Sequence, residues 1–100
     1  MRLERIAWTE AEPPSEAAVR ATLLAEGFEA LLWQDSPHAY YAPHAHEDDE
    51  CLCVLAGEIS FEVGGSRLRL GPGDRLRLPA GTLHAATAGP AGASYLIGRR

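Results

Sequence analysis

The sequence predicts an all-β domain, a small antiparallel sandwich or barrel, with one short helix near the N-terminus. Three observations lead to this class. Short segments alternate apolar and polar residues along most of the chain, turns rich in glycine and proline separate them, and one helical stretch precedes them. A chain of 100 residues can bury one hydrophobic core. We therefore expect a single domain over residues 1–100, with an N-terminal strand and helix over about 1–27 and a barrel over about 28–98.

The helix is predicted between two clear end signals. Ser15 suits the N-cap, residues 17–26 are rich in helix-forming residues, and Gly27 suits the end. Val19 and Leu23 lie four residues apart and form a narrow apolar stripe. We interpret this as a helix that packs on the sheet and carries no chemistry.

The strands are predicted from alternation between turn signals. They are expected at 28–34, 57–63, 66–70, 75–79, 82–88 and 93–98. Gly64-Gly65 is a strong two-residue hairpin signal, and Gly89-Pro90 is interpreted as a turn. The repeated RLRL segments, with arginine at every second position from 67 to 69 and from 75 to 77, are interpreted as the solvated face of a hairpin.

Composition excludes several classes of function. The formal net charge is −5 and the pI is near 5.2, whereas binding to nucleic-acid phosphates needs a basic surface. No segment approaches the roughly 20 apolar residues of a membrane span. Glu4 interrupts the apolar residues near the N-terminus, so we predict no signal peptide and expect a cytoplasmic protein without nucleic-acid or membrane partners.

The two cysteines, Cys51 and Cys53, lie two residues apart. On a strand they would point to the same side, about 6.6 Å apart, so a disulfide between them would be strained. A C-x-C pair can also bind a soft metal, but the chain has no second cysteine pair. We interpret them as ordinary half-buried thiols.

The segment PHAHEDDEC, residues 43–51, concentrates histidines and acids. If the chain is extended from residue 44 to 54, the side chains of His44, His46 and Glu50 share a face with Leu52 and Val54. Apolar residues on that face indicate the interior, where ionisable groups must pair or coordinate. The alternative is a hydrophilic surface loop.

His84 favours the interior site. It follows the turn Pro79-Ala80-Gly81, and the next residues of the same parity are the small Ala86 and Ala88, which leave space beside the imidazole. Three imidazoles and one carboxylate form a mixed nitrogen and oxygen set that suits Fe, Mn, Ni, Co, Cu or Zn.

These residues carry a resemblance to the cupin superfamily. The first cupin motif is matched by His44-Ala45-His46, Glu50 and Gly57, and the second by Gly73, Pro79-Ala80-Gly81 and His84. The sequence departs from the motifs where His38 replaces a glycine and Ala88 replaces an asparagine. The resemblance implies a small jelly-roll β-barrel of the single-domain cupin type, with a divalent transition metal held by His44, His46, Glu50 and His84.

Four further residues are candidates for the lining of the pocket. Tyr40 and His38 have the inward parity if the strand extends back past Pro43, and surface positions in a loop are the alternative. Trp33 and Tyr95 are large aromatic side chains that either line the barrel or belong to its core.

The resemblance implies a metal-binding monocupin, and we expect a small metal-dependent enzyme that acts on a small organic molecule. A dioxygenase, an isomerase and a lyase all stay open, because open metal positions permit each chemistry. The alternative is a barrel that binds or senses a small molecule or metal without turnover. Small cupins are similar to one another in forming homodimers, and residues 2–8 could supply a strand for this contact.

Overall fold

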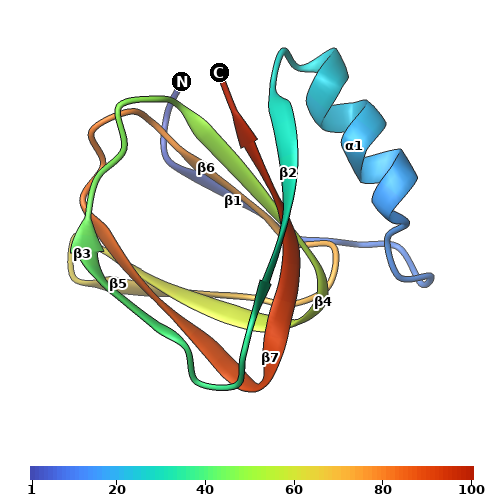
Figure 1. Cartoon of the computed structure of the whole chain (residues 1–100). Helices are drawn as coiled ribbons and strands as arrows, with labels where there is room; N and C mark the ends of the chain where they lie inside the picture. Colours follow the sequence, from blue (N-terminus) through green and yellow to red (C-terminus); the bar gives the residue numbers. More distant parts are fainter.

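The computed structural model describes residues 1–100 and has seven strands and one short helix (Figure 1). In chain order they are β1 (Glu4–Ile6), α1 (Glu16–Ala25), β2 (Glu29–Asp35), β3 (Tyr40–His44), β4 (Glu50–Val63), β5 (Ser66–Leu70), β6 (Arg75–Leu78) and β7 (His84–Arg99). All strand pairs are antiparallel. The all-β class with one N-terminal helix is therefore confirmed.

Two long strands, β4 and β7, shape the fold because each contributes to two layers. Their paired segments around Glu50–Cys53 and Leu96–Arg99 join β6, β1 and β2 in one layer. Their other paired segments join β5 and β3 in the second layer. The hydrogen-bonded path runs β1-β6-β4-β7-β2, and the sheet does not close, because β1 and β2 end this path. The result is a jelly-roll sandwich that curves into a barrel-like shape (Figure 1).

The predicted turn at Gly89-Pro90 is wrong, since β7 bends there without ending, and β4 likewise continues through Gly57. The ladder between them skips residues near Gly57 and again between Ala88 and Ala93, so Gly89-Pro90 lies at a bend and reverses nothing. Gly57 has a φ of 72°, and a Cβ atom there would lie 2.2 Å from the carbonyl oxygen of Gly92. Glycine permits both the conformation and this close approach of the two backbones.

The main core fills the space between the layers, as the alternation predicted. The inward residues of four strands meet there, and they include Ile59, Phe61, Leu70, Leu76, Leu78 and Ala86. The side chains of the intervening residues face outward, because successive residues of a strand point to opposite faces. This arrangement places Leu52 and Val54 on the inner face of β4.

A second, smaller core lies between α1 and the outer face of β4 and β7. Ser15 caps the helix by accepting a hydrogen bond from the backbone N–H of Ala18 at 3.0 Å, as predicted. Val19 and Leu23 pack with Phe28, Leu96 and both cysteines. Cys51 and Cys53 are free thiols and are fully buried, beyond the half-burial expected. The helix has neither the length nor the apolar composition to cross a membrane.

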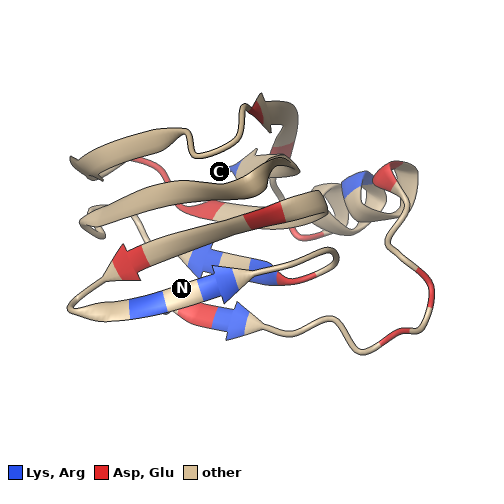
Figure 2. Ribbon diagram, turned by 90° about the horizontal axis from the view of Figure 1, so that it is seen from below, with Lys and Arg blue, Asp and Glu red and all other residues tan.

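The prediction of a solvated arginine face is wrong for β6. Arg75 and Arg77 both pair with Glu26 at the end of α1, with nitrogen–oxygen distances of 3.2 and 2.9 Å. The side chains of Arg75 and Arg77 are only 17% and 27% exposed, so these two arginines are paired and partly buried where the prediction placed them in water. Figure 2 shows the basic segments on the strands around the N-terminus and the acidic segments among them. β5 and β6 both pair with β4, and they form no hairpin with each other.

Candidate metal centre

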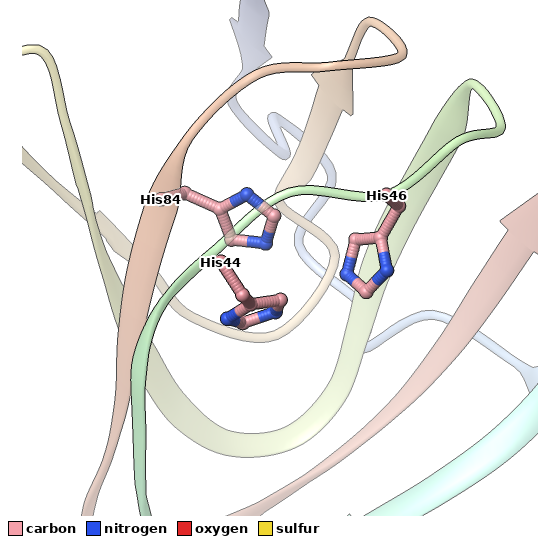
Figure 3. Close-up of side chains that lie close together, drawn as sticks. All are labelled: His44, His46 and His84. Carbon is pink, nitrogen blue, oxygen red and sulfur yellow. The ribbon is translucent and has the colours of Figure 1, made fainter.

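Three histidines from two distant segments of the chain meet at one end of the inner space (Figure 3). His44 ends β3, His46 follows it in the loop, and His84 begins β7. His44 and His84 are directly paired in the ladder between β3 and β7. The ring centroids are 4.4 Å apart for His44 and His84, 4.8 Å for His44 and His46, and 5.3 Å for His46 and His84.

Backbone carbonyls orient two of these imidazoles in the same way. Nδ1 of His44 lies 2.7 Å from the carbonyl oxygen of Ala42, and Nδ1 of His84 lies 2.8 Å from that of Thr82. A carbonyl only accepts hydrogen bonds, so in the neutral ring Nδ1 carries the proton and Nε2 keeps a free lone pair. Histidines that bind a metal through one ring nitrogen usually donate a hydrogen bond from the other nitrogen in this way.

The spacing of the donor atoms suits one metal ion. One nitrogen from each ring lies within 4.8 Å of the others. Two nitrogens on one ion, each at about 2.1 Å, are separated by at most about 4.2 Å. Small rotations of the side chains would bring the three imidazoles into this range. A set of three imidazoles is suited to a divalent transition metal.

Glu50, the predicted carboxylate ligand, lies beside the histidines and is held by an arginine. Its side chain is only 4% exposed, and Oε1 is 3.6 Å from Nε2 of His46. Nε of Arg99 donates a hydrogen bond to Oε2 at 3.0 Å. Glu50 and Arg99 are opposite each other in the ladder between β4 and β7. One carboxylate oxygen therefore faces a histidine while the other is engaged by a cation.

Burial also affects the protonation of the site. Burial lowers the pKa of His84 below its ordinary value of 6.5, and the adjacent His44 and His46 lower it further. The hydrogen bond to Thr82 and the charge of Glu50 act in the opposite direction. His84 is therefore neutral at pH 7, which is the form that binds a metal.

The histidines open into a cavity of about 160 Å³. Its lining is largely apolar, with a few polar groups at defined positions, which is typical of small-molecule sites. The lining residues are Trp33, Tyr41, His44, His46, Glu50, Leu52, Ile59, Phe61, His84, Ala86, Tyr95, Ile97 and Arg99.

Asp35 fixes three of the aromatic residues in this lining. Its Oδ1 accepts hydrogen bonds from the hydroxyl of Tyr41 at 2.5 Å and from Nε1 of Trp33 at 3.0 Å. Its Oδ2 accepts one from the hydroxyl of Tyr95 at 2.6 Å. The hydrogen bond to Asp35 and burial raise the pKa of Tyr41, and burial followed by the same carboxylate raises the pKa of Tyr95. Both phenols are therefore protonated at pH 7.

The four predicted lining residues divide into two pairs. Trp33 and Tyr95 lie in the lining. Tyr40 and His38 do not: Tyr40 is 63% exposed, and His38 lies on the surface in the turn between β2 and β3. The assumption of a continuous strand fails because the pairing of β3 with β7 shifts register between Tyr41 and His44.

His38 explains one departure from the cupin motif. It has a φ of 62°, the left-handed conformation in which glycine is favoured and which only a few per cent of other residues adopt. His38 thus occupies a position where the motif's glycine would be unstrained. It plays no part in the cavity.

Sequence reasoning missed Tyr41, Asp35 and Arg99. The register shift in β3 brings Tyr41 to the cavity together with His44, although their parity differs. Arg99 could have been found, because it has the same parity on its strand as Tyr95 and Ile97. The role of Asp35 depends on contacts between strands, which no local pattern indicates.

Comparisons with known proteins agree with this geometry. The sequence model of the family described as "Cupin domain" matches residues 31–96. Acireductone dioxygenase of Leishmania braziliensis is 42% identical over 69 residues, which cover 64% of this chain and 19% of that protein. Acireductone dioxygenase of Tuber melanosporum is 38% identical over 58 residues, which cover 53% of this chain and 34% of that protein. The chain thus spans about a third or less of the length of these relatives.

Solved structures show the same architecture. DMSP lyase DddQ from Ruegeria pomeroyi superposes with a TM-score of 0.67 and 32% identity, covering 73% of this chain and 38% of that one. KdgF from Halomonas sp. superposes over 97% of this chain and 79% of that one, with a TM-score of 0.63 and 23% identity. The second similarity concerns the fold alone.

Proposed function

This chain belongs to the cupin family, and we propose that residues 1–100 form one cupin domain that acts as a small metal-dependent enzyme. His44, His46 and His84 would hold a divalent transition metal, and Glu50 would be the fourth protein ligand. The substrate would be a small organic molecule. The observation that carries this proposal is the meeting of three imidazoles, two of them with Nδ1 on a carbonyl, inside a largely apolar cavity.

The size of the cavity limits the substrate. A cavity of about 160 Å³ with a largely apolar lining fits a small organic molecule. When bound, the metal would supply Lewis-acid or oxygen chemistry. The apolar residues Leu52, Ile59 and Phe61 would exclude bulk water from the bound molecule. The Asp35 network would fix the rings of Tyr41 and Tyr95 against it.

The relatives support two reaction types for the first assays. Similarity to acireductone dioxygenases supports an oxygen-dependent reaction, and similarity to DMSP lyase supports an elimination. Oxygen uptake with an acireductone, and consumption of DMSP, would distinguish them when measured on protein loaded separately with Fe, Ni, Co, Mn or Zn. The chain covers only part of each relative, so the substrate of this domain has to be determined by such assays.

The metal site itself is tested by comparing two histidine variants. Protein purified without a histidine tag is loaded with metal, dialysed and analysed for its elements. We expect near-stoichiometric metal in the wild type and in His38→Ala, which removes an exposed histidine outside the cavity. We expect its loss in His84→Ala. Equal retention of metal by the two variants, or a wild type that cannot be loaded, would contradict the proposed site.

A second candidate function is binding or sensing without turnover. It is favoured by one observation: Glu50 is the only carboxylate in the cavity lining, and Arg99 already engages it. No other acid lines the cavity to act as a general acid or base. Tight, saturable binding of a small molecule without any product would support this candidate.

We also propose that the domain forms a homodimer through β2. This strand ends the hydrogen-bonded path and exposes Leu31, at 52%, beside Trp33. β1 and β2 both end the path with one partner strand in their own chain, and the exposed apolar side chains of Leu31 and Trp33 favour β2 for the contact. Light scattering should give the mass of a dimer, and Leu31→Glu should shift it toward the monomer. A wild-type monomer at micromolar concentration would contradict this.

A further inference from the structure

Arg99, the last residue of β7, is the one arginine in the cavity lining, and the chain contains no lysine. Its Nε is anchored on Oε2 of Glu50 at 3.0 Å, and its side chain is 52% exposed. Nη1 and Nη2 make no hydrogen bond within the chain, so the outer part of the guanidinium group is free. The other arginines lie outside this lining, and six of them are held by contacts of their own: Arg5, Arg20, Arg69, Arg75 and Arg77 each pair with an acid, and Arg100 binds the carbonyl of Glu26.

Because Nε of Arg99 is held by Glu50, Nη1 and Nη2 form a preorganised binding site. The hydrogen bond to a buried carboxylate fixes the plane of the guanidinium group, and the cross-strand pairing of Glu50 with Arg99 fixes its base. A guanidinium group matches a carboxylate with two parallel hydrogen bonds. A ligand that uses Nη1 and Nη2 would therefore lose little freedom of the protein side chain on binding.

Charge also favours an anionic ligand here. The positive charge of Arg99 is balanced by Glu50. If the proposed function holds, a divalent ion on the histidines adds two positive charges beside this pair. The rest of the chain is acidic, with a net charge of −5. An anion would thus be attracted to the cavity and repelled from most other surfaces.

We propose that Arg99 forms a carboxylate-binding subsite beside the metal centre, so that the ligand of this protein is a small organic acid. One group of the ligand lies at the histidines, and its carboxylate lies on Nη1 and Nη2 of Arg99. The two subsites are joined through a single side chain, because Glu50 contacts His46 with one oxygen and Arg99 with the other. This short connection fits a compact acid and the cavity of about 160 Å³.

The test uses two probes that differ by one carboxylate. Malate and lactate share a 2-hydroxy acid group that can bind a metal, and malate carries one carboxylate more. Both are titrated calorimetrically into cobalt-loaded wild type, Arg99→Gln, Arg99→Lys and Arg67→Gln. Arg67 is an exposed arginine of β5 outside this cavity, so its variant makes the same change of charge elsewhere.

We expect the wild type and Arg67→Gln to bind malate at least about tenfold more tightly than lactate, because a hydrogen-bonded ion pair is added. Arg99→Gln should lose this preference and keep its affinity for lactate. Arg99→Lys should keep part of it, since lysine retains the charge without the paired donors. A wild type without the preference, or Arg99→Gln with it intact, would overturn the subsite.

Cobalt content, measured first, separates this inference from the proposed function. A wild type that takes up no cobalt would overturn the metal centre. The subsite would then be decided on the metal-free chain by the NMR signal of the Arg99 Nε–H group during a malate titration. A saturable shift would support it, and an unchanged signal would overturn it. If only Arg99→Gln fails to hold cobalt, the preference for malate over lactate is compared between Arg99→Lys and Arg67→Gln. A smaller preference in Arg99→Lys would support the subsite, and an equal preference would overturn it.

Discussion

The carboxylate of Asp35 can be neutralised almost without a change of shape by the substitution Asp35→Asn. In the structure both of its oxygens accept hydrogen bonds, one from the hydroxyl of Tyr41 and Nε1 of Trp33, the other from the hydroxyl of Tyr95. Asparagine keeps one accepting oxygen and replaces the other by an NH₂ group. Whichever way the amide turns, one tyrosine hydroxyl then faces a donor and loses its acceptor.

The cost follows from the kind of bond that is lost. Hydrogen bonds to a charged group contribute about 1.5–3 kcal/mol each. In Asp35→Asn one such bond disappears if the NH₂ group faces Tyr95, and two if it faces Tyr41 and Trp33; those that remain are weakened because their acceptor is neutral. Tyr95 is only 3% exposed, so water does not replace the missing acceptor there. We expect the free energy of unfolding to fall by about 2–4 kcal/mol.

Urea unfolding of a double-mutant cycle with Tyr95→Phe measures this directly. Without the Tyr95 hydroxyl, the amide can turn its oxygen to Tyr41, so Asp35→Asn should cost at least about 1 kcal/mol less than in the wild type. Tyr40→Phe is the control, because the Tyr40 hydroxyl makes no hydrogen bond to Asp35 and its side chain is exposed. Additivity of the two substitutions within about 0.5 kcal/mol would refute the network.

Two further predictions concern stability and reactivity. Gly57→Ala should destabilise the fold by about 1–3 kcal/mol more than Gly64→Ala in urea unfolding, because both sites have positive φ but only Gly57 places a Cβ 2.2 Å from the Gly92 oxygen; equal costs would contradict this. Burial raises the pKa of the Cys51 thiol, and that of Cys53 from 9.0 to about 11. Folded protein at pH 8 should therefore react with a thiol reagent far more slowly than in urea. A folded chain that is labelled as fast as the unfolded one would disprove the burial of the thiols. The stability that the protonated thiols contribute is complete below pH 9 and falls as the pH rises toward 11.

Alternation in the sequence predicted the faces of the strands but not their length. Ile59, Phe61 and Leu76 lie inward because a strand has a period of two whatever its partner. Gly57 and Gly89-Pro90 have the composition of turns, yet each lies at a bend within a paired strand. Only the partner strand distinguishes a bend from a reversal, and that information is not local.

The same limit applies to the site. The two motifs predicted that His44, His46 and His84 come together, because each motif is a short segment that can be recognised by itself. The engagement of Glu50 by Arg99 depends on the register between β4 and β7, which no single segment specifies. The inward position of Tyr41 depends on a register shift in β3.

The direct pairing of His44 with His84 has a consequence for folding kinetics. A metal ion held by both residues would join β3 to β7 across the ladder and close the chain between residues 44 and 84. In the unfolded chain only His44 and His46 are neighbours, so an ion bound there early in folding would gain His84 as a ligand only when β7 pairs with β3. Loss of the ion would remove this cross-link, so the end of the ladder between β3 and β7 would open more readily in the metal-free chain than in the loaded one.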